Sequence, residues 1–455
     1  MIIRKISSEG LSHNSYFISA GGLAAVIDPR RDCGVYLDLA QEIGARIVHI
    51  IETHRNEDYV IGSLELAART GAAIYHGHQM DFAYGNKVKD GDRLRLGPVE
   101  LRIIETPGHT LESISLVVTD TEVSDIPYAV CTGDALFAGD VGRTDFFGPE
   151  KRHEVSEMLF WSIWQKILPL GDGTIVFPAH GAGSVCGSEI SDHEYTTVGY
   201  EKRTNPLLAL SKEEFIQKKV NEHHYLPPYF KKMESVNRQG PPLTHHLPDL
   251  RPYPVKEIRE LQGKVQILDI RSPTSFAGGH IPGSLSIWKE GIPAFAGWFL
   301  TYDTPIILVD DFNCDLVEVS RHFLRLGYDN LKGYLAGGFP AYFKSGSPIG
   351  RIEAWSVHDL AGRLKGEDIF LLDVRDIANV GRAGRIPGSR HIYIGELPGR
   401  LGEVPRDLLV AAYCDAGYKG SLAASILARN GYPRLANILG GMTGYINAGY
   451  PVTRE

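Results

Sequence analysis

The sequence predicts a mixed α/β protein made of one layered domain and two smaller α/β domains. Two observations predict this fold class. Over residues 1–225, short apolar runs that are typical of strands alternate with helical patterns and turn residues. The C-terminal part of the chain contains a repeat, because similar apolar segments occur twice after residue 250. A length of 455 residues agrees with this division, since single domains commonly contain about 150 residues.

The first 225 residues contain segments of both kinds. Continuous apolar runs bounded by turn residues indicate strands, and apolar residues three or four positions apart indicate helices. The predicted strands are 23–27, 47–51, 99–104, 114–118, 128–131 and 174–177. The predicted helices are 35–43 and 155–168. This alternation favours a layered arrangement of sheets and helices.

The C-terminal part contains an internal repeat. The segment ILDIRSPTSFAGGHIPGSLSI resembles LLDVRDIANVGRAGRIPGSRHI, and a Gly-Gly turn follows later in both copies. Asp269 lies 104 residues before Asp373, and Gly337 lies 103 residues before Gly440. Equal spacing at two anchors predicts two copies of one small α/β domain.

These patterns divide the chain into three domains and a connector. We expect the domains at 1–225, 255–350 and 351–455. Residues 226–254 are rich in proline and show little periodicity, which is typical of a linker. The adjacent histidines His245 and His246 cannot share a helix face, so we expect solvated linker residues rather than metal ligands.

Composition excludes several classes of protein. Charged residues make up 22% and hydrophobic residues 43%, which excludes wholesale disorder. The net charge of −8 and the pI of about 6.1 offer no basic surface for nucleic acid. No stretch reaches the roughly 18 apolar residues of a transmembrane helix, so no membrane partner is expected.

Five cysteines in a long chain do not form a disulfide framework, and the first residues lack the apolar run of a signal peptide. These two observations favour a reducing, cytoplasmic location. A homo-oligomer is compatible with the sequence, which does not determine the oligomeric state.

Four residues that can bind a metal follow predicted strands. His54 comes after 47–51, His109 lies in the PGHT turn, Asp134 in CTGDALF, and His180 in FPAHGAG. Because sites in α/β proteins commonly form at strand ends, we expect these side chains to lie close together. Imidazole and carboxylate groups in such a cluster predict a metal site.

These segments resemble the metallo-β-lactamase superfamily over about residues 1–225, and the resemblance implies its αββα sandwich fold. The family pattern in the first loop is His-x-His-x-Asp-His, whereas this chain reads His54-Arg55-Asn56-Glu57-Asp58-Tyr59. An amide and a phenol are poor substitutes for neutral imidazole on zinc. Asn56 and Tyr59 therefore argue against a dinuclear zinc hydrolase.

Two imidazoles and one carboxylate remain, from His54, His109 and Asp134. Such a set on one side of an ion, with open positions opposite, suits non-haem Fe(II) oxygenases. The segments IDPRRD, ETPGHTLESISLV and GDVGRTDFF also resemble the persulfide dioxygenases of the superfamily, which hold one iron with residues at these three positions. The resemblance implies one Fe(II) per chain, with O₂ and a small-molecule persulfide as substrates.

Four further residues of this domain lie in segments near the predicted metal site, and two of them have two interpretations. The family places an arginine of the GRTD segment near the organic thiol, and Arg143 occupies that position or is an ordinary surface residue. We expect His180 to form hydrogen bonds near the metal rather than to bind it. Cys131 belongs to the predicted core. Cys186 is either a small buried thiol or a thiol near the iron that accepts or relays sulfur.

The second copy of the repeat contains a predicted nucleophile. Cys414 ends an apolar strand and precedes a short Gly-containing loop and a helix, where backbone N–H groups stabilise a thiolate. Lys419 adds positive charge. Both copies resemble rhodanese domains, whose loop contains a cysteine, four residues, a basic residue and often Ser or Thr. The resemblance implies that Cys414 carries a persulfide, although Lys419 replaces the usual arginine and Gly420 displaces the serine.

The first copy lacks this nucleophile. When the repeats are aligned, Asp310 occupies the position of Cys414, and Cys314 lies four residues further on. A carboxylate cannot carry sulfane sulfur and repels anions. We expect this copy to be a catalytically silent spacer or docking module.

Together the sequence predicts a fused persulfide dioxygenase and sulfurtransferase that acts in sulfide detoxification or sulfur metabolism. Persulfide and O₂ are converted to sulfite and thiol, and Cys414 exchanges sulfane sulfur with sulfite or thiosulfate. Two alternatives remain: a zinc-dependent thioester hydrolase similar to glyoxalase II with appended rhodanese repeats, and a non-catalytic sulfur-carrier scaffold.

Overall fold

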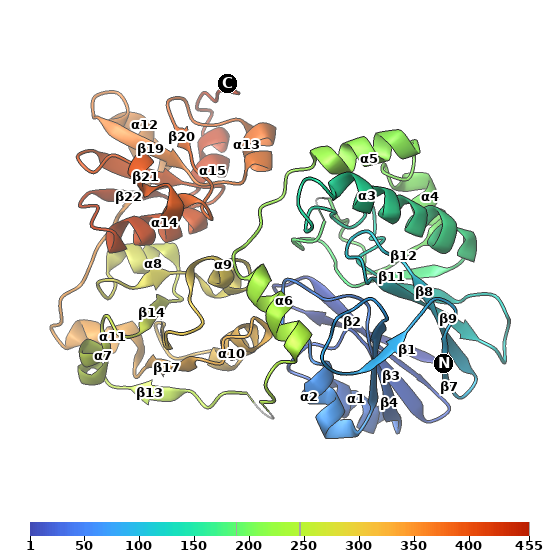
Figure 1. The fold of residues 1–455 in the computed structure, drawn as a ribbon. Coiled ribbons are helices and arrows are strands. Elements are labelled where there is room, and N and C mark those ends of the chain that lie inside the picture. Colours follow the sequence, from blue (N-terminus) through green and yellow to red (C-terminus); the bar gives the residue numbers. More distant parts are fainter. Residues whose placement is uncertain (188, 245–246, 455) are drawn as a thin grey trace. The chain divides into compact units, whose positions relative to one another are not determined.

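The computed structural model describes residues 1–187, 189–244 and 247–454 (Figure 1). The chain forms two compact units. The first contains Met1–Leu247 with Leu324–Gly327, and the second contains the rest of the C-terminal part. The expectation for His245 and His246 lies outside the described residues.

The first unit contains two six-stranded sheets. One sheet has the order β1 (Ile2–Ser8), β2 (His13–Ala20), β3 (Leu23–Ile27), β4 (Arg46–Glu52), β5 (Ala73–Gly77) and β6 (Asn86–Val88). The other has the order β12 (Thr196–Thr197), β11 (Ile175–Pro178), β10 (Ala129–Gly133), β9 (Ile114–Asp120), β8 (Val99–Glu105) and β7 (Arg93–Leu96). The strands β3 to β6 are parallel, as are β10 and β11, and the remaining neighbours are antiparallel.

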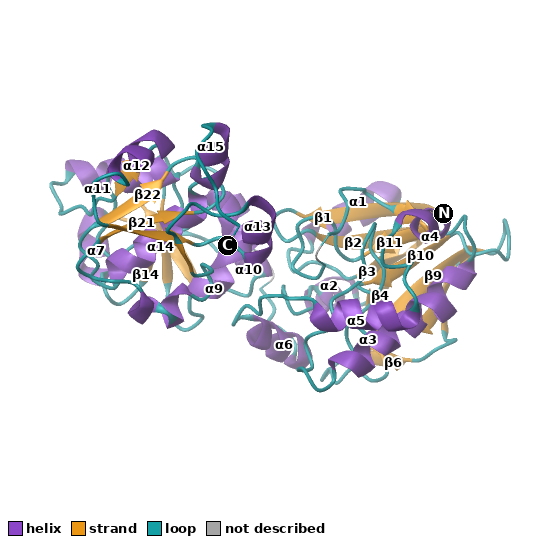
Figure 2. Ribbon diagram, turned by 90° about the horizontal axis from the view of Figure 1, so that it is seen from above, coloured by secondary structure: helices purple, strands orange, loops and turns teal. Residues whose placement is uncertain are grey.

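Helices cover the outer faces of both sheets (Figures 1 and 2). The helices of this unit are α1 (Gly34–Ile43), α2 (Ser63–Thr70), α3 (Arg152–Trp161), α4 (Val198–Thr204), α5 (Lys212–Asn221) and α6 (Phe230–Gln239). One core lies between the sheets, a second packs α1 and α2 on the first sheet, and a third packs α3 and α5 on the second sheet. This is the αββα sandwich that the resemblance implied.

The period of two residues in a strand explains why apolar runs are continuous here. In β2, Ile18 faces the core between the sheets, and its neighbour Phe17 faces α1 and α2. In β9, Leu116 faces the central core, and Val117 faces α3. Because successive side chains point to opposite faces and both faces are buried, the central strands carry apolar residues on both faces and form continuous apolar runs.

The sequence predicted the strands of the central sheets well. The structure confirms the strand 23–27 as β3, and the other five predicted strands correspond to β4, β8, β9, β10 and β11. The predicted helix 155–168 is α3 followed by a π-helical turn over Ser162–Ile167. The stretch 226–254, predicted as a linker, contains α6, whose sequence FKKMESVNRQ is mostly polar.

The second unit contains two copies of one parallel α/β domain. The sheet orders are β13-β17-β16-β14-β15 and β18-β22-β21-β19-β20, so the copies share one topology. The strands are β13 (Arg251–Tyr253), β14 (Gln266–Asp269), β15 (Leu285–Ser286), β16 (Ile306–Val309), β17 (Leu331–Leu335), β18 (Glu353–Trp355), β19 (Ile369–Asp373), β20 (Arg390–His391), β21 (Leu409–Tyr413) and β22 (Leu435–Ile438). The helices are α7 (Val255–Leu261), α8 (Pro273–Gly278), α9 (Ile292–Phe299), α10 (Leu316–Arg325), α11 (Gly338–Lys344), α12 (Val357–Arg363), α13 (Ile377–Ala383), α14 (Tyr418–Arg429) and α15 (Gly441–Asn447).

The Asp-x-Arg segments explain why the two copies share a sequence pattern. In each copy the arginine Nη2 lies 2.6 Å from the aspartate Oδ2 and donates a second hydrogen bond of 2.7 Å to a glycine carbonyl. These pairs, Asp269–Arg271 and Asp373–Arg375, are buried. A buried charge needs such a partner, so both residues of the pattern are required together.

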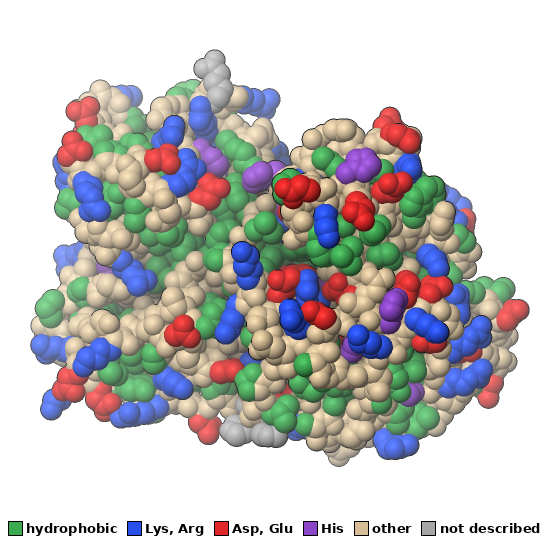
Figure 3. Space-filling model, in the orientation of Figure 1, with side chains coloured by type: hydrophobic (Ala, Val, Ile, Leu, Met, Phe, Trp, Pro, Cys, Tyr) green, Lys and Arg blue, Asp and Glu red, His purple; other side chains and the backbone are tan. Residues whose placement is uncertain are grey.

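All five cysteines are free thiols, as the sequence predicted. Among the described helices, none has the length and apolar character that crossing a membrane requires. On the face shown in Figure 3, side chains of both charge signs are interspersed.

Candidate metal centre and reactive cysteine

Strand ends bring the predicted metal-binding residues together. His54 follows β4, His109 lies between β8 and β9, and Asp134 follows β10. Asp134 Oδ2 lies 3.5 Å from His54 Nε2 and 3.3 Å from His109 Nε2. All three side chains are at most 1% exposed. His180 follows β11, which is parallel to β10, and therefore lies beside Asp134.

Hydrogen bonds on the far side of each ring set the orientation of the imidazoles. His109 Nδ1 donates to the backbone oxygen of Arg143 at 3.0 Å. Thr53 donates its hydroxyl to Asp28 Oδ2 at 2.8 Å and accepts from His54 Nδ1 at 2.9 Å. Both Nε2 atoms therefore face Asp134, which is the orientation that metal-binding histidines adopt. Burial lowers the pKa of His54, but the neighbouring Asp134 outweighs burial and raises this pKa to about 9, so a metal bound here replaces a proton of His54.

The residues fit a metal ion because their ligand atoms lack other partners. Among the described residues, His54 Nε2, His109 Nε2 and Asp134 Oδ2 have no hydrogen-bond partner and are buried. Each unpaired buried polar group lowers the stability of the fold by about 1–3 kcal/mol. A cation bound by all three ligand atoms would remove this loss. Burial lowers the pKa of His109 to about 3, which keeps the ring in the neutral form that binds a metal.

His180 forms two hydrogen bonds beside this centre. Its Nδ1 lies 2.7 Å from Asp134 Oδ1, and its Nε2 lies 3.1 Å from Asp58 Oδ2. Burial alone lowers the pKa of His180, but the two carboxylates outweigh burial and raise the pKa well above its usual value. His180 thus links Asp134 to the first loop.

Two further residues with ligand atoms, Glu57 and Cys186, face the centre. Glu57 is 2% exposed, and burial raises the pKa of its carboxyl to about 8. Cys186 is buried, and its sulfur lies within 4.8 Å of ligand atoms of His109 and Asp134. Cys186 therefore combines both features that the sequence presented as alternatives, burial and proximity to the centre. No role was predicted for Glu57, because it occupies a spacer position of the family pattern.

Arg143 is not a surface residue, which corrects one of the two interpretations of the sequence. Its side chain is 1% exposed and makes five hydrogen bonds. Two of these go to Asp145 at 2.6 and 2.7 Å, and the others go to backbone oxygens. The guanidinium thus forms hydrogen bonds within the domain, and the backbone oxygen of Arg143 orients His109.

Helix α6 fixes the loop that carries His54. The buried side chain of Asn237 donates to the backbone oxygens of Asn56 at 2.8 Å and Tyr59 at 2.9 Å, and accepts from Ile61 N at 3.1 Å. One side chain therefore satisfies three backbone groups of a loop that lacks regular structure.

Cys414 lies where the sequence placed it, between β21 and α14. Gly417 N donates to Cys414 Sγ at 3.1 Å, and the helix begins at the next residue. Lys419 is the second residue of α14, and its Nζ lies 3.0 Å from Asp415 Oδ2 in the loop. Gly420 is required by packing, because a Cβ atom there would lie 2.3 Å from Asn437 Oδ1. This contact explains why glycine precedes the serine of the loop.

The first rhodanese copy holds a carboxylate in the same place. Asp310 follows β16 as Cys414 follows β21. The backbone oxygen of each accepts an equivalent hydrogen bond of 2.7 Å, from Phe339 N in the first copy and from Met442 N in the second. Asp310 accepts hydrogen bonds from Cys314 N and from a neighbouring asparagine side chain. The loop thus binds its own carboxylate, which supports the predicted alignment of the two copies.

The two copies also contact each other beside the reactive loop. The Trp288 ring lies 4.9 Å from the Tyr418 ring, and Ser286 hydrogen-bonds to Ser421 and Ser425 of α14. The first copy therefore supports the helix whose N-terminus faces Cys414.

Comparisons with known proteins agree with this architecture. Residues 9–180 match the Metallo-beta-lactamase superfamily, and residues 254–345 and 356–448 match the Rhodanese-like domain. The mitochondrial persulfide dioxygenase ETHE1 of Bos taurus is 30% identical over 204 residues, which are 43% of this chain and 70% of that protein. The chain belongs to the metallo-beta-lactamase superfamily. It carries two rhodanese-like domains after the superfamily fold.

Other members of the superfamily are similar as well. The hydroxyacylglutathione hydrolase GloC of Haemophilus influenzae is 28% identical over 207 residues, which are 41% of this chain and 87% of that protein. A metallo-beta-lactamase structure from Staphylococcus aureus has a TM-score of 0.66 and 31% identity, and covers 74% of this chain and 98% of that one. Similarity to persulfide dioxygenases, together with the two rhodanese-like domains of this chain, places it among enzymes of sulfur metabolism.

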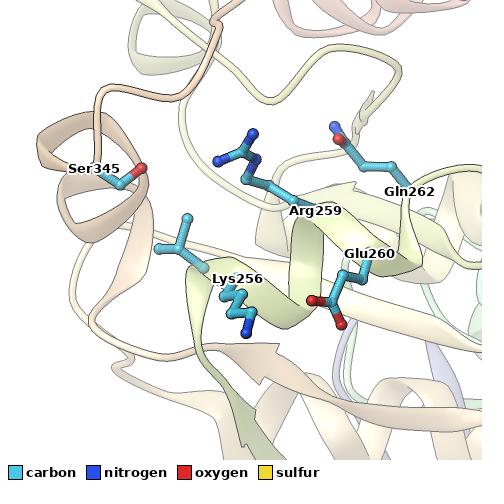
Figure 4. Close-up of a pocket in the computed structure, with 6 residues that line it drawn as sticks. Lys256, Arg259, Glu260, Gln262 and Ser345 are labelled. Carbon is cyan, nitrogen blue, oxygen red and sulfur yellow. The ribbon is translucent and has the colours of Figure 1, made fainter.

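A separate hollow lies on the first rhodanese-like domain (Figure 4). Lys256, Arg259 and Glu260 extend from α7 beside it, and Ser345 lies opposite. Its lining contains neither cysteine nor histidine, so it resembles neither of the two reactive sites.

Replacing Asn237 with alanine is expected to weaken both the fold and the metal site. Three backbone groups of the His54 loop lose their partner, so the free energy of unfolding should fall by about 1–3 kcal/mol. Metal affinity should fall by about tenfold, as for other supporting residues of metal sites. Gln239→Ala on the exposed side of the same helix is the control. Equal stability and metal content in both variants would contradict the role given to Asn237.

Replacing Gly441 with alanine should disrupt the Cys414 loop. Gly441 has φ +50°, and a Cβ atom would lie 2.2 Å from the backbone oxygen of Cys414. Gly449→Ala is a matched control, because Gly449 also has a positive φ but open space around it. In the control, the free energy of unfolding should fall only by the roughly 1–2 kcal/mol that a left-handed conformation costs an alanine. Equal free energies of unfolding for the two variants, measured by chemical denaturation, would contradict this constraint.

Proposed function

We propose that the N-terminal domain oxidises a small-molecule persulfide with O₂ at one Fe(II) ion, and that Cys414 transfers sulfane sulfur. The observation that carries the proposal is the convergence of His54 Nε2, His109 Nε2 and Asp134 Oδ2, all buried and without hydrogen-bond partners among the described residues. Similarity to persulfide dioxygenases supports the choice of substrate.

The proposed ligand set explains the choice of iron. Fe(II) held by two imidazoles and one carboxylate retains open positions and takes part in redox chemistry with O₂, which zinc does not. The outer sulfur of the persulfide is oxidised to sulfite, and the thiol is released. O₂ accepts four electrons and supplies two of the sulfite oxygens, while water supplies the third.

The protein contributes orientation and exclusion of water. Thr53 and the Arg143 backbone hold the two imidazoles with their Nε2 atoms toward Asp134. The complete burial of these groups strengthens each electrostatic interaction, because little solvent screens it. His180 retains Asp134 Oδ1 through its hydrogen bond and leaves Oδ2 for the ion.

Cys414 is the proposed carrier of sulfane sulfur. Its thiolate attacks the outer sulfur of thiosulfate, so a Cys414 persulfide forms and sulfite leaves; in the reverse direction sulfite takes the sulfur back. The N–H of Gly417 at 3.1 Å and the N-terminus of α14 stabilise the anionic sulfur. Both reactive sites then handle the same class of compound, a sulfane sulfur with sulfite as product or partner.

Similarity to hydroxyacylglutathione hydrolases favours a second candidate, a zinc-dependent thioester hydrolase. The same imidazole and carboxylate ligands can bind zinc. Asn56 and Tyr59 weigh against it, because neither the amide nor the phenol replaces an imidazole ligand. The free state of all five cysteines supports a reducing, cytoplasmic location for either enzyme.

Metal content separates the two candidates. Protein purified without oxygen should contain about one iron per chain by mass spectrometry, and removal of this iron should abolish O₂ uptake with glutathione persulfide. Two zinc ions per chain together with thioester hydrolysis would contradict the oxygenase. A metal-free protein that consumes no O₂ would point to a carrier scaffold.

Two substitutions should separate the two activities. His109→Ala removes a ligand and should reduce O₂ uptake with glutathione persulfide by at least about 100-fold, while thiosulfate sulfurtransfer remains. Cys414→Ser should abolish sulfurtransfer and leave O₂ uptake unchanged. Sulfurtransfer that survives in Cys414→Ser would show that another group carries the sulfur.

A further inference from the structure

Glu57 is a buried carboxylate without a partner that satisfies it. Its side chain lies on the loop between β4 and α2, and both of its oxygens lack hydrogen-bond partners among the described residues. Arg55 Nη2 lies 3.7 Å from Glu57 Oε1, and the same nitrogen forms a closer ion pair with Glu234. A buried carboxyl group without hydrogen bonds stays neutral unless a cation stabilises its charged form. Glu57 differs from other buried carboxyl groups because two histidine rings lie beside it.

The position of Glu57 identifies that cation. One of its oxygens and one ring nitrogen each of His54 and His109 lie within 4.8 Å of one another. These are the two histidines that Asp134 also approaches, at 3.5 and 3.3 Å. Two imidazoles thus lie within reach of two different carboxylates.

We propose that Glu57 is a fourth protein ligand of the metal ion held by His54, His109 and Asp134. This inference rests on the metal centre of the proposed function but not on the identity of the metal or on the reaction. It assigns a role to a residue that occupies a spacer position in the family pattern.

The local structure of the loop supports this role. Asn56 stands where the family pattern has its second histidine, and its side-chain amide turns back to the backbone oxygen of His54 at 3.3 Å. Asn237 holds the backbone on both sides of Glu57, through the carbonyl groups of Asn56 and Tyr59. The loop therefore presents the next side chain, Glu57, in a fixed position, and a carboxylate replaces the missing imidazole.

A second carboxylate changes the properties of the centre. Two carboxylates balance the charge of a divalent ion, and oxygen ligands favour Fe(II) or Mn(II) relative to copper. Four protein ligands also leave fewer positions for exogenous groups than three do.

Metal affinity tests the proposal directly. Glu57→Gln keeps the size of the side chain and removes its charge, and it should weaken Fe(II) binding at least about tenfold in competition with a chelator. Glu52→Gln is the matched control, because Glu52 is also buried and its oxygens also lack hydrogen bonds, but it belongs to none of the candidate metal groups. The control should bind Fe(II) as the unmodified protein does. Equal affinity of Glu57→Gln and the unmodified protein would overturn the proposal.

A structural measurement decides the question even where a variant does not fold. In crystals of the unmodified protein loaded with Fe(II), a Glu57 oxygen at about 2.0–2.2 Å from the ion supports ligation. A separation above about 3 Å overturns it. If the protein binds no iron, the proposed oxygenase fails, but the same distance in zinc-loaded crystals still tests Glu57.

Discussion

The buried carboxylate of Asp134 organises the N-terminal domain. Its two oxygens have different partners: Oδ1 accepts a hydrogen bond from His180, while Oδ2 lies near the Nε2 atoms of His54 and His109. Removing these groups from water is costly, and the hydrogen bonds of the fold satisfy only one of the two oxygens. The fold therefore concentrates negative charge and unpaired ligand atoms at one point, which makes this cluster a candidate metal site.

The two reactive sites use the same structural principle with different chemistry. Each lies beyond the carboxyl ends of parallel strands, where loops can present polar groups that a sheet interior would exclude. In the first unit the loops present imidazole and carboxylate ligands. In the second unit Cys414 follows a strand, and the backbone N–H of Gly417 donates to its sulfur. In the proposed function, sulfane sulfur connects the two sites, because the metal centre would oxidise it and Cys414 would carry it.

The sequence predicted those parts of the protein that depend on local patterns. Buried strands such as β3 were found because both faces of each sheet are covered and their apolar runs are continuous. The position of Asp310 was found because the repeat fixes its alignment with Cys414. The residues His54, His109 and Asp134 were brought together because strand ends meet at one edge of the sandwich.

Features that depend on tertiary contacts were not predicted. Helix α6 buries Phe230, Met233 and Asn237 at helical spacing, but only two of these residues are apolar and prolines lie on both sides of the segment. Glu57 gains its role from burial, which no spacing in the sequence reveals. The engagement of Arg143 depends on Asp145 and on backbone oxygens far along the chain.

The stoichiometry of oxygen consumption tests the central claim most directly. Iron-loaded protein supplied with glutathione persulfide should consume one O₂ for each sulfite formed and each persulfide lost. Loss of persulfide without O₂ uptake, or sulfite formation that does not depend on O₂, would contradict an oxygenase built on this centre.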